Sequence, residues 1–253
     1  MSQLWALKLE YDGTNFAGWQ FQPRELAVQQ VLDEAAAKLN KNVPLRSVVA
    51  GRTDAGVHAT GQVAQIRLSG DWQPNRVREA LNYHMKPHPV VVVRAVAVDD
   101  AWNARFSARA RHYRYVILNR RARPGLDLHR AWHVVDPLDA DLMQQAGQYL
   151  LGTHDFSSFR ASSCQASGPI RTLERLDVRR EGEKVIIEAS ARSFLHHQVR
   201  NMAGTLAWFG EARFEPAHMA RILAAASRAA AGPTAPPDGL TLVGVSYDPD
   251  PFA

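Results

Sequence analysis

Alternating and helically spaced apolar residues divide the first half of the chain into short elements. Apolar side chains at every second position from Trp5 to Tyr11 predict a strand, because successive strand residues face opposite sides. From Leu26 to Leu39 they recur at helical spacing. The expected order is strand 5–11, helix 26–39, strands near 46–50 and 61–68, a helix from Pro74 to about His84, and strand 90–98.

The second half repeats this order of elements. The expected elements are strand 113–118, a helix opened by Asp136-Pro137 and ending before Gly152, hairpin strands 171–179 and 184–191, an amphipathic helix 195–209, a helix over about 216–230, and strand 240–247. The predicted fold class is α+β. Two ferredoxin-like βαββαβ halves, 1–105 and 106–253, would form an extended, mostly antiparallel sheet with helices on one side.

Composition indicates an ordinary globular protein of 253 residues, with 46% hydrophobic and 22% charged residues. Its single cysteine, Cys164, excludes an internal disulfide and a multi-cysteine zinc site, and it favours a reducing compartment. No secretory signal is visible, and no apolar run approaches the roughly 20 residues of a membrane span. A cytoplasmic protein with no membrane partner is expected.

The charge of +5 is modest, but arginines concentrate in one segment. Eight of them fall between Arg105 and Arg130, with a single acid, Asp127. On a strand, Tyr113 and Tyr115 would share one face and Arg114 the other. Arginine forks bind phosphates, and aromatic faces stack on unpaired bases. The segment therefore indicates nucleic-acid binding, with a solvated basic edge strand as the alternative.

The stretch GRTDAGVHA at 51–59 joins two of the predicted strands and is longer than a simple hairpin turn. It carries Arg52, Asp54 and His58, and two glycines provide flexible joints. Such a loop can present charged side chains for function. The alternative is a solvated turn in which Asp54 caps its own backbone.

Several kinds of site are excluded by missing motifs. The chain has no Gly-Lys-Ser/Thr phosphate loop, no Gly-x-Gly-x-x-Gly after a strand, and no zinc-deaminase signature. His196 and His197 are adjacent on a predicted helix, so they are not expected to share a metal. Neither a metal nor an organic cofactor is expected. On that helix Arg200 could either extend to solvent or reach a carboxylate in the other half.

The stretch GRTDAGVHA resembles the catalytic-aspartate motif of the tRNA pseudouridine synthase A family. Further motifs of that family follow in order along nearly the whole chain. They are YDGTNFAGWQ at 11–20, GQVAQ at 61–65, ARFSARARHYRY at 104–115, LLGTHDFSSFR at 150–160, FLHHQVRNMAGTL at 194–206 and APPDGLTL at 235–242.

The resemblance implies the pseudouridine synthase fold and isomerisation of uridines 38, 39 and 40 in the anticodon stem-loop of tRNA. It also implies a homodimer that works without cofactor or metal. Asp54, Tyr113 and Arg200 match the catalytic aspartate, the active-site tyrosine and the arginine paired with the aspartate. Substrate contacts are expected from Tyr113, Arg52, His58 and Arg105, with Arg52 helping to extrude the target nucleotide.

The sequence departs locally from the family pattern at Trp102-Asn103, Phe21-Gln22, Gln198 and residues 168–171. None of these positions is one of the catalytic residues. Whether Asp54 adds to the base, adds to the sugar or removes a ribose proton stays open. Two other classes also stay open. A non-catalytic RNA-binding protein would not need Asp54, and an RNA N-glycosidase would release free uracil.

Overall fold

The computed structural model describes residues 2–253, which form two compact units. The first unit contains the chain up to Arg111 together with Thr241–Ala253, and the second contains His112–Leu240. The halves expected from the sequence, 1–105 and 106–253, divide the chain a few residues earlier. They also assign the closing strand to the second half, whereas most of it groups with the first unit.

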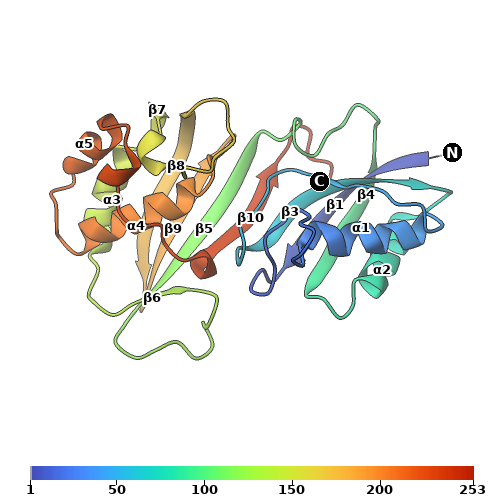
Figure 1. Cartoon of the computed structure of the whole chain (residues 1–253), viewed down its shortest axis with the longest axis horizontal. Helices are drawn as coiled ribbons and strands as arrows, with labels where there is room; N and C mark the ends of the chain where they lie inside the picture. The colour runs from blue at the N-terminus through green and yellow to red at the C-terminus, as the bar shows by residue number, and fades with distance from the viewer. Residues whose placement is uncertain (1) are drawn as a thin grey trace. The chain divides into compact units, whose positions relative to one another are not determined.

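The strands of the first unit lie in the order β4, β1, β3, β10 (Figure 1). Antiparallel pairing joins β1 to β3 and to β4, and β10 runs parallel to β3. A short strand, β2, pairs with the middle of β3. The bounds are β1 (Ser2–Tyr11), β2 (Val48–Val49), β3 (His58–Ser69), β4 (Val90–Val98) and β10 (Leu240–Ser246).

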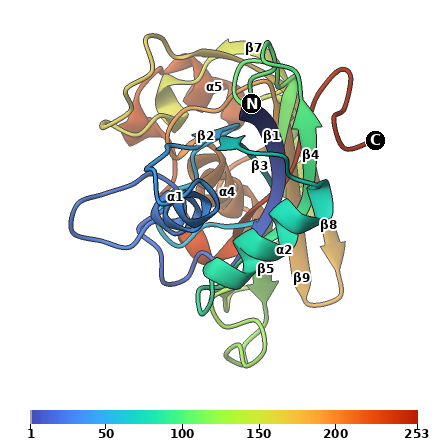
Figure 2. The same ribbon diagram turned by 90° about the vertical axis from the view of Figure 1, so that its right-hand side faces the viewer.

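Two helices, α1 (Val28–Leu39) and α2 (Pro74–His84), cover one face of these strands (Figure 2). The buried side of α1 is the one that its helical spacing predicts. It carries Val28, Val31, Leu32, Ala35, Ala36 and Leu39, all at most 6% exposed. Burying such an apolar face stabilises a helix more than its intrinsic propensity does. The predicted positions of both helices are confirmed, except that α1 begins at Val28, two residues after the predicted start.

In the second unit the strands lie in the order β5, β9, β8, β7, and β6 runs parallel to β5. The predicted hairpin is confirmed: β8 and β9 are antiparallel and joined by a tight turn at Gly182, whose φ is 58°. The sequence pattern did not predict the short strands β6 and β7. The bounds are β5 (Ala110–Asn119), β6 (Trp132–Val134), β7 (Gly152–Asp155), β8 (Ile170–Glu181) and β9 (Lys184–Ala191).

Three helices belong to the second unit: α3 (Ala140–Gln148), α4 (Gln198–Gly210) and α5 (His218–Ala224). The predicted start of α3 at Asp136-Pro137 is wrong. The N-cap is Asp139, whose carboxylate accepts hydrogen bonds from two backbone N–H groups of the first turn at 2.8 and 3.0 Å.

The other two helices are shorter than predicted. α4 does not begin at Leu195. His197 has a φ of 62°, in the left-handed region, so a right-handed helix cannot continue through this residue. The helix expected over 216–230 stops at Ala224, and Ala226 has a φ of 45°. A separate 3₁₀ turn, Arg228–Ala230, follows.

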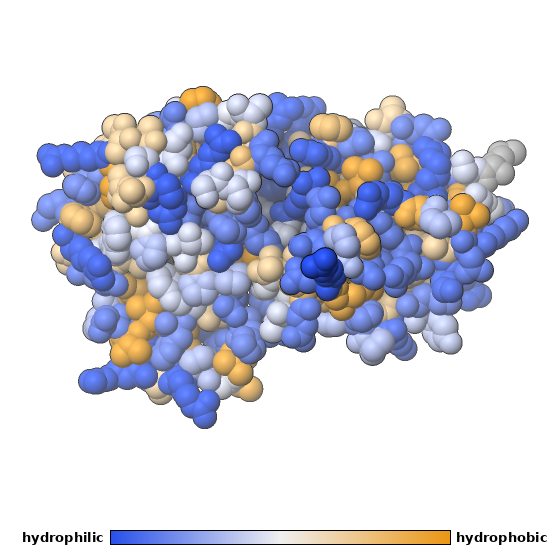
Figure 3. Space-filling model, in the orientation of Figure 1, coloured by the Kyte–Doolittle hydropathy of each residue, from blue (hydrophilic) through white to orange (hydrophobic). Residues whose placement is uncertain are grey.

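The predicted α+β class with mostly antiparallel strands is confirmed by these pairings. Over residues 2–253 the structure has five α-helices, and none is long and apolar enough to cross a membrane. The face drawn in Figure 3 is mainly hydrophilic, with small scattered hydrophobic areas.

Candidate active site

The loop that carries Asp54 connects β2 to β3 and is held by main-chain hydrogen bonds from the segment after β1. The N–H of Trp19 donates to the carbonyl of Thr53 at 3.0 Å, and the N–H of Gly56 donates to the carbonyl of Phe16 at 3.2 Å. These bonds lie on either side of Asp54 in sequence. The path of its backbone is therefore fixed on both sides.

Two glycines make this close approach of main chains possible. A Cβ at Gly13 would lie 2.0 Å from the carbonyl oxygen of Val57, a distance that no side chain tolerates. Gly18 has a φ of 97°, and a Cβ there would lie 2.7 Å from the carbonyl oxygen of Thr53. The two glycines of YDGTNFAGWQ are thus required by the loop against which that segment packs.

Buried polar side chains of the neighbouring strands β1 and β3 hydrogen-bond to the loop that carries Asp54. The hydroxyl of Tyr11 lies 2.8 Å from the hydroxyl of Thr53, and Gln62 donates from Nε2 to the carbonyl of Gly51 at 2.8 Å and to the Tyr11 oxygen at 3.3 Å. Burial raises the pKa of Tyr11 to about 12, which the two hydrogen bonds only partly oppose. Tyr11 therefore keeps its proton at neutral pH, and the group acts as a scaffold.

His58 is the first residue of β3 and lies outside the exposed part of the loop. It is 5% exposed, and its Nδ1 accepts a hydrogen bond from the N–H of Gly13 at 3.0 Å. This bond ties the end of the loop to the turn after β1. The geometry gives His58 a part in fixing the loop.

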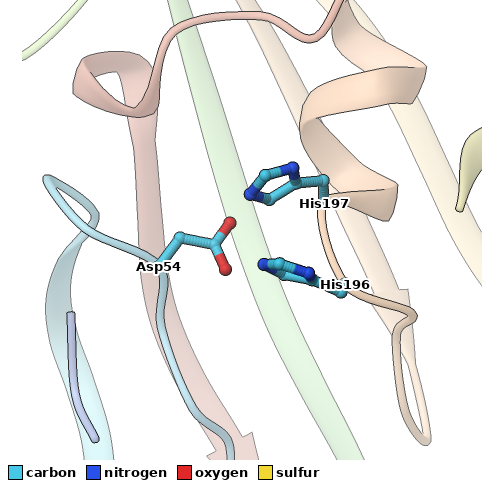
Figure 4. Close-up of side chains that lie close together, drawn as sticks. All are labelled: Asp54, His196 and His197. Atoms are coloured by element: carbon cyan, nitrogen blue, oxygen red, sulfur yellow. The ribbon is translucent and has the colours of Figure 1, made fainter. Parts of the chain in front are cut away.

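Asp54 itself is half-buried, and Figure 4 shows its carboxylate projecting from the loop. Arg52, two residues earlier, is exposed. Arg105 lies on a different segment of the same unit, between β4 and β5. Its guanidinium is exposed and stands 5.6 Å from the ring centroid of Phe106. The structure thus keeps Arg52 and Asp54 on one rigid loop, with Arg105 elsewhere on the unit.

Tyr113 lies in the second unit, on the face of β5 that is buried. The residue is 8% exposed, and its ring meets the ring of Phe194 edge to face, with centroids 5.3 Å apart and planes at 88°. This T-shaped arrangement is favourable for aromatic pairs and fixes the orientation of the Tyr113 ring. The predicted alternation of β5 is confirmed, since Tyr113 and Tyr115 are buried and Arg114 is exposed.

Arg200 is in the first turn of α4 and is half-buried. Its Nε donates to the carbonyl of Ala235 at 2.8 Å, and its own carbonyl accepts from the N–H of Ala235 at 3.2 Å. The next residue on that loop, Pro236, accepts a hydrogen bond from the hydroxyl of Tyr115 at 2.8 Å, and burial raises the pKa of this tyrosine. These contacts hold the guanidinium in place.

Asn201 extends this anchoring into the interior. It is fully buried, and its amide donates to the carbonyl of Phe159 at 2.8 Å. Its oxygen accepts from the hydroxyl of Thr234 at 2.6 Å and from Arg228 at 3.2 Å. Three separate segments of the second unit therefore meet at one side chain beside Arg200. Nothing in the sequence pattern singles out Asn201, since these partners are distant along the chain.

His196 and His197 precede α4 and lie close together, with ring centroids 4.0 Å apart and ring nitrogens within 4.8 Å (Figure 4). The prediction that both histidines lie on a helix is wrong, since α4 begins only at Gln198. His196 also shares a hydrogen bond with the hydroxyl of Ser163 at 3.1 Å. The adjacent pair in the sequence was the one available signal of this arrangement.

A sequence model of the family described as tRNA pseudouridine synthase matches residues 8–107 and 146–248. A tRNA pseudouridine synthase A of Acidiphilium cryptum is 62% identical over 98% of both chains. The protein of that name from Paramagnetospirillum magneticum is 57% identical over 95% of this chain and 94% of its own.

Another relative of that name, from Gluconobacter oxydans, is 54% identical over 98% of this chain and 91% of its own. Among solved structures, a Cbf5–Nop10–Gar1 complex contains a chain with 12% identity and a TM-score of 0.34, over 81% of this chain and 54% of that one. This last likeness is too small to interpret. The sequence relationships, which span nearly the full length, place the chain in the tRNA pseudouridine synthase A family, as an isomerase that acts on tRNA.

Proposed function

We propose that this chain converts uridines 38, 39 and 40 of the tRNA anticodon stem-loop to pseudouridine, with Asp54 as the catalytic nucleophile or base. The observation that supports Asp54 most directly is its setting. A half-buried carboxylate projects from a loop that is fixed by backbone bonds to Phe16 and Trp19. Holding a reactive group in one geometry lowers the entropic part of the barrier.

The reaction conserves every atom of the nucleotide. The bond between uracil N1 and ribose C1′ breaks, the base turns, C5 bonds to C1′, and the proton of C5 is lost while N1 gains one. A carboxylate can attack a carbon, stabilise an oxocarbenium-like sugar or remove a proton. All three routes begin from an ionised Asp54.

Arg200 is proposed as the cation that keeps Asp54 ionised when the bound base has displaced water. Arginine suits this purpose because it stays charged and offers a planar fork to a carboxylate. Tyr113 is proposed to hold the detached uracil against its ring. The edge-to-face contact with Phe194 supports this proposal, because it sets the plane of the Tyr113 ring before substrate binds.

For paired stem nucleotides the target base must leave the stack, at a cost of a few kcal/mol. We propose that Arg52, exposed beside Asp54, occupies the vacated space and offsets part of this cost. Arg105 is proposed as a further contact to the RNA. His58 is almost fully buried, so we propose that it serves substrate binding indirectly by holding the loop.

The remaining proposals follow the family resemblance. The protein is proposed to act in the cytoplasm as a homodimer, with tRNA as its partner and without cofactor or metal ion. Sedimentation of the purified protein tests the dimer. Dialysis against a chelator before the assay tests the metal, and unchanged turnover is expected.

The test of the catalytic assignment uses tRNA transcripts labelled with tritium at uridine C5, each with a single uridine among positions 38, 39 and 40. Wild type is expected to release tritium to water from each transcript without forming free uracil. Asp54→Ala and Asp54→Asn are expected to bind tRNA normally and release none. Asp100→Ala is the matched control, since it removes an exposed carboxylate that pairs with Arg67.

Each remaining outcome contradicts a specific part of the proposal. Free uracil would identify an N-glycosidase. Turnover by Asp54→Ala at the wild-type rate would remove Asp54 from the chemistry. No tritium release by wild type from any transcript, with binding intact, would indicate an RNA-binding protein that does not catalyse the reaction at these positions.

A further inference from the structure

The arginine-rich segment between Arg105 and Arg130 divides into structural and exposed groups. Arg111 is buried and donates from Nε and Nη2 to the carbonyl of Ala50 at 3.1 and 2.6 Å. Arg114 forms an ion pair with Glu188 at 2.7 Å. These two arginines of β5 are used within the fold, so the positive charge available to a ligand lies further along the segment.

The loop from 120 to 131 connects β5 to β6 and extends away from the strands of its unit (Figure 1). Its first residue, Arg120, folds back on it and donates to the carbonyls of Ala122 at 3.1 Å and Arg123 at 3.4 Å. The carbonyl of Arg120 lies 2.8 Å from Nε2 of His133. The start of the 120–131 loop therefore has a defined shape without a ligand.

Two acidic groups beside the 120–131 loop are already paired with basic side chains, and a third contacts a histidine. Glu183 pairs with Arg120 at 2.7 Å, and Asp127 pairs with Lys184 at 2.8 Å. Asp238 lies 3.3 Å from Nδ1 of His129. Within residues 2–253, Glu183 and Asp127 are therefore neutralised by Arg120 and Lys184 rather than by the arginines that follow Arg120.

Arg121 and Arg123 are both exposed, and across residues 2–253 the structure gives neither of them an ion pair or a side-chain hydrogen bond. They flank Ala122, whose carbonyl is held by Arg120. Two guanidinium groups thus stand on a fixed backbone with nothing to compensate their charge. A structural purpose does not account for them, because they stabilise no other part of the fold.

We propose that Arg121 and Arg123 bind phosphates of the tRNA substrate, which makes the 120–131 loop a second RNA-contact element. Guanidinium forks match phosphate geometry, and a polyanion supplies the missing counter-charge. The ordered loop reduces the entropy lost on binding. This proposal rests on tRNA being the substrate and does not depend on the role of Asp54.

The test compares Arg121→Ala/Arg123→Ala with wild type in tRNA binding at several salt concentrations. Each lost phosphate contact lowers the slope of log affinity against log salt by about 0.7 to 0.9. For two contacts, the advantage of wild type is therefore expected to shrink about tenfold between 50 and 200 mM salt. The value of kcat at saturating tRNA is expected to stay unchanged, with the loss confined to KM.

Arg213→Ala/Arg221→Ala is the control, since it removes the same charge from two exposed arginines, Arg221 inside α5 and Arg213 before it, where Arg213 pairs with Glu211. An equal loss of slope in the control would reduce the effect to net charge and overturn the proposal, as would an unchanged slope in the test variant.

A protein interface is the alternative use of the 120–131 loop, because Leu126, 98% exposed, and Leu128 are apolar and exposed. Sedimentation of both variants therefore accompanies the binding assay, and dissociation of an oligomer by the test variant would also overturn the proposal.

Failure here is distinguishable from failure of the catalytic proposal. A wrong assignment of the 120–131 loop leaves tRNA binding by Arg121→Ala/Arg123→Ala unchanged while Asp54→Asn still loses turnover. A wrong assignment of Asp54 leaves turnover in Asp54→Asn while the salt response of the loop variant is altered.

Discussion

The hydroxyl groups of Tyr11 and Thr53 lie 2.8 Å apart inside the first unit, at the end of strand β1 and one residue before Asp54. Through this contact the interior of the sheet determines where the loop can place the carboxylate. Buried hydroxyls that satisfy each other cost little, but one that loses its partner is destabilising. The position of Asp54 therefore depends on residues that never meet the substrate.

Tyr11→Phe is expected to lower the free energy of unfolding by about 1 to 3 kcal/mol, because it leaves the buried hydroxyl of Thr53 and the amide of Gln62 short of a partner. A lower kcat is also expected, since the loop loses its fixed position. Urea denaturation and initial rates measure the two effects. Tyr83→Phe, at an exposed position, is the control, and an equal effect there would disprove the loop's dependence on Tyr11.

Gly13→Ala is expected to displace the Asp54 loop, because the new Cβ would lie 2.0 Å from the carbonyl oxygen of Val57. Overpacking of this kind lowers the free energy of unfolding by about 1 to 3 kcal/mol. The loss in kcat, expressed as activation free energy, is expected to be larger. Gly168→Ala, where a Cβ meets nothing within 4 Å, is the control. Normal turnover by Gly13→Ala would show that the segment after β1 does not fix the loop.

Arg200→Lys is expected to lose most of the activity while remaining folded. Lysine keeps the charge but provides neither the planar fork nor the Nε donor to the carbonyl of Ala235. Turnover of labelled tRNA and the thermal midpoint are measured together, with Arg221→Lys as the control. A wild-type rate would make Arg200 a structural residue only.

Asn201→Ala is expected to reduce the free energy of unfolding by about 2 to 4 kcal/mol, because partners on three segments lose hydrogen bonds to a fully buried side chain. Thr234→Val removes one of these bonds and also the bond that the Thr234 hydroxyl accepts from Arg228 at 3.2 Å, so it is expected to cost roughly two thirds as much. Chemical denaturation measures the change in unfolding free energy for both variants. A change below about 0.5 kcal/mol in Asn201→Ala, typical of surface sites, would contradict the anchoring of α4 by this side chain.

Glu188 gives a pH-dependent prediction. Partial burial raises the pKa of its carboxyl, but hydrogen bonds and charges from Arg114 and Arg179 outweigh this and hold the pKa below its ordinary value. The ionised form therefore stabilises the fold above the unfolded pKa, near 4.5, and the contribution disappears as pH falls through the lower folded value.

Glu188→Gln is accordingly expected to be less stable than wild type at pH 6 and to approach it at pH 3. Denaturation midpoints at the two pH values measure this change. A constant difference between the two proteins would show that the arginines around position 188 do not lower its pKa.

Local patterns predicted much of the fold. The buried side of α1 and the β8–β9 hairpin follow from spacing and one turn glycine, which are properties of neighbouring residues. The start of α4 could not be predicted, because the positive φ of His197 depends on its surroundings and the sequence there reads as a continuous helix. The strands β6 and β7 are too short for a pattern and exist through pairing with distant strands.

The motifs identified the site residues, but they did not show what supports them. Nothing in the sequence indicates that Gly13 and Gly18 approach the Asp54 loop, or that His58 faces inward to accept from Gly13. Such contacts join residues some 40 positions apart, and spacing carries no information about them. The prediction from the arginine-rich segment was incomplete for the same reason. The sequence does not distinguish Arg111, which is buried, from Arg121, which is exposed.

The Asp54 loop is shaped by backbone bonds and by glycines of another segment, and the Asp54 carboxylate takes no part in them. Its architecture and its reactivity can therefore be altered separately. An isosteric Asp54→Asn protein should keep the loop intact, accept tRNA and stop before the first bond is broken. Such a protein would serve as a trap, holding an unreacted tRNA long enough for the complex to be crystallised or imaged.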